Sequence, residues 1–173
     1  MNNDKNNTEY LEKVDVNGFA KYHIAEEVFL NFDPNRYYVL PSRGKKLKMM
    51  PMWDSEWSMG LWRSNWGDPP SSMVTHTYWE KMYYFKYLFK SPSFKNEVKA
   101  EWNNFKSHVE EVKSEVNSVR QSIAKAQVAN FNRWPSPGYP LNIQFNSWEE
   151  EADYLENFLD ERITILDNRI SKW

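Results

Sequence analysis

Two acidic residues in the first third of the chain have the spacing to bind one metal ion. Residues 46–53 form an alternating segment that runs directly into Asp54, Ser55 and Glu56. Side chains at positions i and i+2 of an extended segment point the same way, so Asp54 and Glu56 could converge on a single cation. Mg²⁺ prefers carboxylate and phosphate oxygens and keeps several waters, so two protein carboxylates would suffice. Carboxylates at a strand end are also often simply solvated, and the spacing alone leaves both interpretations open.

A third acidic residue, Asp33, lies just after a predicted helix. A hairpin after it would bring the chain back, so that Asp33 could lie beside Asp54. Its simpler role is to end the helix together with Pro34, because the residue before a proline is pushed out of the α-helical region.

Few other residues suggest catalysis. The chain has no cysteine, which excludes disulfides, thiolate nucleophiles and cysteine-based zinc sites. The three histidines, His23, His76 and His108, are far apart on separate predicted helices and have no ligand spacing. No G-x-G-x-x-G or G-x-x-x-x-G-K motif occurs, so the sequence contains no recognisable phosphate-binding loop.

Two clusters have both a binding and a structural interpretation. Four basic residues in a predicted hairpin could bind an anion, although cations on an edge strand more often prevent aggregation. Four tryptophans in the following loop could stack on sugar rings, although such rings more often fill a core. The basic residues are Arg43, Lys45, Lys46 and Lys48, and the tryptophans are Trp53, Trp57, Trp62 and Trp66.

The composition is that of a globular domain. The chain has 173 residues, of which 17% are aromatic, and this length suits one domain with a real core. The formal charge of −2 and the pI near 6.0 do not favour nucleic acid as a partner. No apolar run is long enough to predict a membrane span.

Hydrophobic periodicity predicts a mainly α (α+β) fold, a helical bundle with a small antiparallel β-hairpin. Helices are expected over 15–31, over 73–89, from Pro92 through Phe105, over 109–126, and from Ser147 to the end. Ser91 is the expected N-cap before Pro92, and Ser147 with Glu150 forms a predicted capping box. The hairpin is expected at about 37–53, with an aromatic loop over 55–72. A polar segment, 1–14, precedes a single domain, 15–173.

The order of these elements resembles the C-terminal half of the spore-coat CotH kinase family. The resemblance rests on residues 14–22, Glu26-Glu27, 31–33, Tyr37-Tyr38 and 50–56, and on three stretches nearer the C-terminus. Its most specific element is the Pro-x-Trp-Asp-x-acid stretch at 51–56, which is followed by Gly60. The later stretches are 89–94 with Trp102, 130–134 and 159–167.

The resemblance implies a divergent protein-kinase-like lobe that transfers phosphate from ATP to protein hydroxyls. By position, Asp33 corresponds to the catalytic aspartate, Asp54 to the metal-binding aspartate and Glu56 to the second acidic position. Asn35 is the candidate cofactor-binding asparagine, next to Arg36, which stands where the family places an asparagine. Phosphoryl transfer depends on positioning the reactants and neutralising the charge of the phosphate more than on covalent catalysis. A general base and a metal site are therefore the least that such a site requires.

The resemblance also implies partners that the chain itself does not contain. Mg²⁺ and ATP are the cofactors of the complete parent, and the family's N-terminal lobe, with its nucleotide-binding lysine, has no counterpart here. We therefore expect a fragment that is inactive alone, binds neither cofactor tightly and acts on a protein substrate together with the missing lobe. The sequence does not decide the compartment, and an extracytoplasmic or cell-surface parent is one alternative.

Two other functions compete with this one. The first is a non-catalytic surface or adhesion module that uses its aromatic loop to contact glycan or protein, and Arg36 in place of asparagine favours it. The second is a metal-dependent hydrolase, which lacks the additional ligands that such sites generally require.

Overall fold

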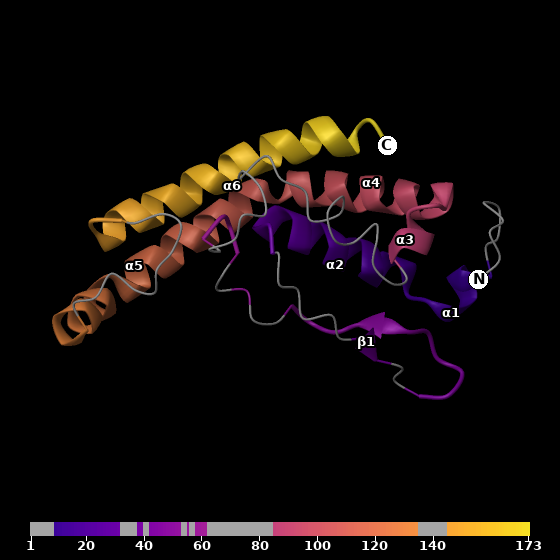
Figure 1. The fold of residues 1–173 in the computed structure, drawn as a ribbon, viewed down its shortest axis with the longest axis horizontal. Coiled ribbons are helices and arrows are strands. Elements are labelled where there is room, and N and C mark those ends of the chain that lie inside the picture. The colour runs from indigo at the N-terminus through magenta and orange to yellow at the C-terminus, as the bar shows by residue number, and fades with distance from the viewer. Residues whose placement is uncertain are drawn as a thin grey trace.

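The computed structural model describes residues 9–31, 38–39, 42–52, 55, 58–61, 85–134 and 145–173, and within them the fold is mainly helical (Figure 1). Four long helices form the body, and two short helices and one hairpin accompany them. The helices are α1 (Tyr10–Lys13), α2 (Val16–Phe29), α3 (Phe85–Leu88), α4 (Pro92–Ser107), α5 (Val109–Arg133) and α6 (Trp148–Ile170), and the strands are β1 (Tyr38–Val39) and β2 (Lys48–Met49).

Helices α2, α4 and α5 run in roughly the same direction, away from α1 and α3, and α6 runs back against them (Figure 1). Helix α6 runs antiparallel to the α4–α5 pair, because Lys106 contacts Asp167 whereas Lys113, one element later, contacts Asp160. Helix α2 packs against both α4 and α6, and α5 extends beyond the end of α2 alongside the first half of α6 (Figure 1). The bundle predicted from sequence is confirmed.

Helix α2 begins at the expected place and ends earlier than expected. Asp15 caps its N-terminus by accepting a hydrogen bond from the backbone N–H of Gly18 at 3.2 Å. Its C-cap is Leu30, which adopts a left-handed conformation with φ 49° and lies fully buried. The helix therefore ends before the Asp33-Pro34 signal, because burial of the Leu30 side chain holds a conformation that leucine rarely adopts.

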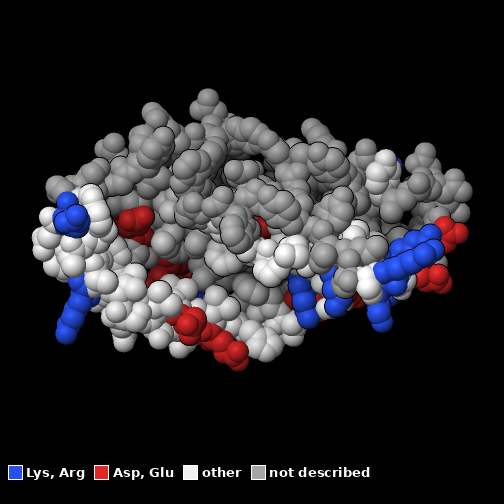
Figure 2. Space-filling view, turned by 90° about the horizontal axis from the view of Figure 1, so that it is seen from below, with Lys and Arg blue, Asp and Glu red and all other residues white. Residues whose placement is uncertain are grey.

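The hairpin is antiparallel, as predicted, and its second strand, β2, is shorter than expected. Tyr38 pairs with Met49 and Val39 with Lys48. Leu47 forms a separate parallel bridge with Val14, so the N-terminal end of the described chain is tied to the hairpin. The four basic residues predicted there are exposed, and Lys and Arg side chains gather towards the right of Figure 2, the side on which Figure 1 draws the hairpin.

An aromatic core fills the space between α2, α3, α4 and α6. Phe94, Val98 and Trp102, spaced four residues apart along α4, are buried in it. His23 of α2 lies against Phe89, with ring centroids 4.8 Å apart in an edge-to-face arrangement. Ring pairs of this kind add to the stability that burial provides.

Of the two C-terminal helices, α6 begins as the sequence predicts, whereas α5 is less buried than its apolar repeat predicts. In α6 the N-cap at Ser147 is confirmed, since Glu150 N–H donates to Ser147 Oγ at 3.1 Å, which is one half of the predicted capping box. The Glu150 carboxylate reaches back to the N–H of Asn146 rather than of Ser147. In α5 the apolar repeat predicts a partner along its length, yet no residue of α5 is buried, and Val119 is 48% exposed.

Candidate functional site

The four predicted site residues, Asp33, Asn35, Asp54 and Glu56, lie outside the described residues, as does Arg36. Their roles therefore stay predictions. The structure describes the chain on both sides of the segment that contains them, up to Asn31 and again from Ser58, and it shows how these two flanks are held.

A backbone hydrogen bond between described residues joins the two flanks. The N–H of Met59 donates to the carbonyl oxygen of Phe29 at 2.6 Å, at the last residue of α2. Met59 has φ 54° and Gly60 has φ 78°, so two successive residues adopt left-handed conformations in this turn. A methionine in that conformation is strained, and it persists only where neighbouring contacts hold it. We call this contact the Phe29–Met59 junction.

Helix α6 braces the junction from the other side. The hydroxyl of Tyr154 donates to the carbonyl oxygen of Met59 at 3.2 Å. Burial raises the pKa of the Tyr154 hydroxyl, which keeps it protonated and able to donate. The ring also contacts those of Phe145 and Phe158. Sequence analysis did not single out Tyr154, because its partner is 95 residues away in the chain.

Five buried polar side chains surround the C-terminal half of α2. They come from α2, from the residue that follows its C-cap, and from α6, and each is at most 2% exposed. Buried polar groups of this density are unusual in a structural core and mark functional sites or specific networks. The residues are His23, Glu26, Glu27, Asn31 and Arg162.

The best-defined contact in this group is the ion pair of Arg162 and Glu27. Arg162 Nη2 lies 2.9 Å from Glu27 Oε2, and Arg162 Nε donates to the Glu27 carbonyl oxygen at 2.7 Å. Burial lowers the pKa of Arg162 to about 10, and the attraction of the Glu27 carboxylate offsets part of that effect. The guanidinium remains charged at neutral pH. In the sequence, Arg162 stands at a position of α6 where the spacing of Leu155, Leu159, Leu166 and Ile170 calls for an apolar residue, but this pattern does not identify its partner.

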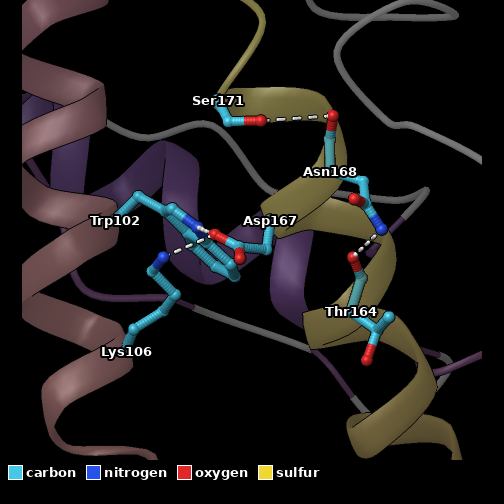
Figure 3. A network of polar contacts seen from close by, with 6 residues as sticks. All are labelled: Trp102, Lys106, Thr164, Asp167, Asn168 and Ser171. Carbon is cyan, nitrogen blue, oxygen red and sulfur yellow. Dashed lines mark hydrogen bonds and ion pairs between the residues drawn. The ribbon is translucent and has the colours of Figure 1, made fainter.

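A second polar group joins α6 to α4 nearer the C-terminus (Figure 3). Asp167 accepts hydrogen bonds from Lys106 Nζ at 2.5 Å and from the Trp102 indole at 2.9 Å. These bonds, that of Lys106 first, lower the pKa of the Asp167 carboxyl. Lys106 and Trp102 both belong to α4, so the contact fixes α6 to α4 and we interpret it as structural.

Within the part of the chain that the structure describes, no three His, Asp or Glu side chains gather into a metal-binding group. The chemistry of the predicted donors, two carboxylates separated by one residue, suits Mg²⁺. None of the described helices is both long and apolar enough to cross a bilayer.

Comparison with known proteins supports the resemblance seen in the sequence. A family model described as CotH kinase protein matches residues 1–166. No curated protein and no solved structure matches the chain.

Proposed function

Because this chain belongs to the CotH kinase protein family, we propose that it supplies the acidic part of a site for metal-assisted transfer of phosphate from ATP to protein hydroxyl groups. Such a reaction depends on positioning the reactants and on neutralising charge at the transferred phosphate. A lobe that fixes one base and one metal site contributes both functions.

In this proposal each acidic residue has a separate role. Asp33 accepts the proton of the attacking hydroxyl, as the aspartate of a kinase catalytic loop does. Asp54 and Glu56 hold Mg²⁺ through their carboxylate oxygens, and Asn35 contributes its amide to the same cofactors. When bound, Mg²⁺ would supply positive charge to the phosphate oxygens.

The Phe29–Met59 junction is the observation that best supports these roles. Asp33 follows Phe29 by four residues and Glu56 precedes Met59 by three. A chain spans at most about 3.5 Å per residue, so the α-carbons of these residues lie within roughly 14 Å and 11 Å of the junction. Since Tyr154 and Phe29 hold the junction, both carboxylates are attached by short lengths of chain to one fixed point.

We further propose that tight binding of ATP requires a second lobe. The chain has no glycine-rich phosphate-binding motif, and the predicted acidic residues alone provide no cradle for the phosphates. On its own the chain is therefore expected to bind the metal weakly and to transfer no phosphate.

Thermal unfolding in the presence of Mn²⁺ or Mg²⁺ tests the metal site directly. We expect millimolar metal to raise the melting temperature of the wild-type chain, because a ligand that binds only the folded state stabilises it. Asp54→Asn should abolish that rise, whereas Glu111→Gln, which neutralises an exposed carboxylate of α5, should retain it. An equal metal response in wild type and Asp54→Asn would reject the metal role and favour a non-catalytic binding module.

Phosphoryl transfer is tested in a preparation that joins this chain to a nucleotide-binding lobe. We expect Asp33→Asn to reduce phosphate incorporation from ATP into a protein acceptor by at least roughly 100-fold, the lower range for loss of a general base. The melting temperature and its metal response should stay as in the wild type. Undiminished transfer by the variant would exclude Asp33 as the base.

A further inference from the structure

Helix α2 ends in a buried turn from which the chain leads towards Asp33. Leu30 adopts a left-handed conformation, with φ 49°, and its side chain is fully buried. The N–H of Leu30 donates to the Glu27 carbonyl oxygen at 3.2 Å. The N–H of Asn31 donates to the Glu26 carbonyl oxygen at 3.1 Å. These two bonds form a Schellman motif, in which the left-handed residue is usually glycine and is here leucine.

Arg162 of α6 contacts the same turn. Its Nε donates to the Glu27 carbonyl oxygen at 2.7 Å, so this oxygen accepts both the N–H that forms the turn and a guanidinium group. The helix dipole also favours a cation at the C-terminal end of a helix. A leucine in the left-handed region is strained, and the turn persists only where neighbouring contacts hold it. Arg162 is therefore one of the contacts that set the direction in which the chain leaves α2.

The direction of this exit limits where Asp33 can lie. Asn31 is buried, and the turn holds its backbone N–H. Asp33 follows Asn31 by two residues, so at most roughly 7 Å separates their α-carbons. A general base has to lie within hydrogen-bond reach of the hydroxyl that it deprotonates, and a small displacement of a reacting group lowers the rate by a large factor. A change in the turn would therefore displace the candidate base.

We infer that Arg162 is a positioning residue for phosphoryl transfer, because its bond to the Glu27 carbonyl oxygen holds the turn that places Asp33. The inference rests on the proposed function, in which Asp33 is the general base. It gives the buried guanidinium a role besides stability. The two roles can be separated by experiment, because Nη2 of Arg162 contacts the Glu27 carboxylate whereas Nε contacts the Glu27 carbonyl oxygen.

Phosphate transfer from ATP, measured in a preparation that joins this chain to a nucleotide-binding lobe, tests the inference. The double variant Glu27→Gln with Arg162→Met leaves no unpaired buried charge, but it lacks the donor to the Glu27 carbonyl oxygen. Below its melting temperature we expect kcat to fall at least roughly tenfold with the KM for ATP unchanged, because the base is displaced and the nucleotide is not. Arg162→Met alone should show the same kcat although its melting temperature is lower.

Leu166→Ala is the matched control for lost stability. It removes a fully buried side chain of α6, one turn beyond Arg162, and leaves the donor to the Glu27 carbonyl oxygen in place. We expect a melting temperature lowered about as much as in Arg162→Met, with kcat as in the wild type. The rate should therefore follow the presence of Arg162 and not the stability of the variant.

Two results would overturn the inference. One is wild-type kcat in the double variant, and the other is a loss of kcat in Leu166→Ala as large as that in the double variant, since either would limit Arg162 to a role in stability. Failure of the proposed function gives a different result, in which Asp33→Asn transfers phosphate as fast as the wild type does. Asp33 would then not be the base, and Arg162 would have no base to position.

Discussion

Arg162 and Glu27 form an ion pair with no measurable exposure of either residue, and it joins helices that are 135 residues apart in the sequence. The guanidinium contacts both the carboxylate and the backbone carbonyl of Glu27. Arg162 of α6 therefore holds the last turns of α2 through both the side chain and the main chain of Glu27. The same turns lead to Phe29, the residue that forms the junction with Met59. The buried pair therefore supports the base of the candidate site.

Removing one member of this pair should be strongly destabilising. In Arg162→Met the Glu27 carboxylate stays buried without its charge partner, and such a loss costs about 3–5 kcal/mol. Urea denaturation should show a lower midpoint with an unchanged slope. Arg133→Met, which removes an exposed arginine of α5, is the matched control and should change stability by less than about 0.5 kcal/mol.

Comparing the single variant with the double variant distinguishes the stability that the ion pair contributes from the cost of leaving one buried charge without a partner. Glu27→Gln together with Arg162→Met should recover part of the stability that the single change loses, because no unpaired buried charge remains. If the two changes were simply additive, the contact would not be the reason for either loss.

Asp167 links α6 to α4 at a more exposed position, so its removal should cost less. Asp167→Asn weakens the bonds to Lys106 and Trp102, and we expect a loss of about 1 kcal/mol at neutral pH, because the carboxylate is half exposed. Glu161→Gln, an exposed carboxylate of the same helix, should have little effect. A loss as large as that of Arg162→Met would mean that Asp167 has a further partner.

The contribution of Asp167 to folding stability should depend on pH, and the direction of its pKa shift determines how. Hydrogen bonds lower the Asp167 pKa in the folded state below its ordinary value of 3.8. The unfolded chain therefore binds more protons in this range, and the contribution of Asp167 is present above pH 3.8 and lost as the pH falls through the folded-state pKa. The stability difference between wild type and Asp167→Asn, measured from pH 6 to pH 3, should shrink towards the acid end.

Tyr154 offers a test of the junction that leaves the acidic residues intact. Tyr154→Phe removes the hydroxyl that donates to the Met59 carbonyl and should cost about 1 kcal/mol of stability. We also expect a smaller rise in melting temperature with Mn²⁺, because a looser junction fixes the acidic segment less well. Ile163→Val, a packing change on the same helix, should lower stability without a selective loss of the metal response. An unaltered metal response in Tyr154→Phe would show that the junction does not control that segment.

Local sequence signals predicted α2, α4, α5 and α6 well and their contacts poorly, whereas most of the helix expected over 73–89 lies outside the described residues. Asp15, Ser91 and Ser147 are all N-caps, although the side chain of Ser91 makes no capping hydrogen bond. These signals act within one turn and can be recognised without knowing the fold. The partner of Arg162 could not be predicted, because any buried carboxylate of another helix would satisfy the same pattern. The acidic residues of the candidate site were proposed from their type and spacing and from the family resemblance, and both their roles and their arrangement stay predictions.

The apolar repeat of α5 also predicted the contacts of a helix poorly, because it indicates more packing than the structure has. A repeat of valine and isoleucine at intervals of three and four predicts a helix packed along its whole length. The structure packs only the first half, since Val112 lies against the core whereas Ile123 and Val128 are 41% and 51% exposed. Periodicity identifies an apolar face but does not show how far the neighbouring helices extend.

This difference within α5 leads to a prediction about local stability. Backbone amides of residues 123–133 should exchange with solvent much faster than those of residues 109–116, because few buried contacts hold the far end of the helix. Lys113 and Arg120 pair with acidic residues of α6, so the boundary between the two rates should fall near Arg120. Hydrogen exchange followed by mass spectrometry measures this directly, with the amides around the buried Leu166 as the protected reference. Uniformly slow exchange along α5 would mean that another surface covers its far end in solution.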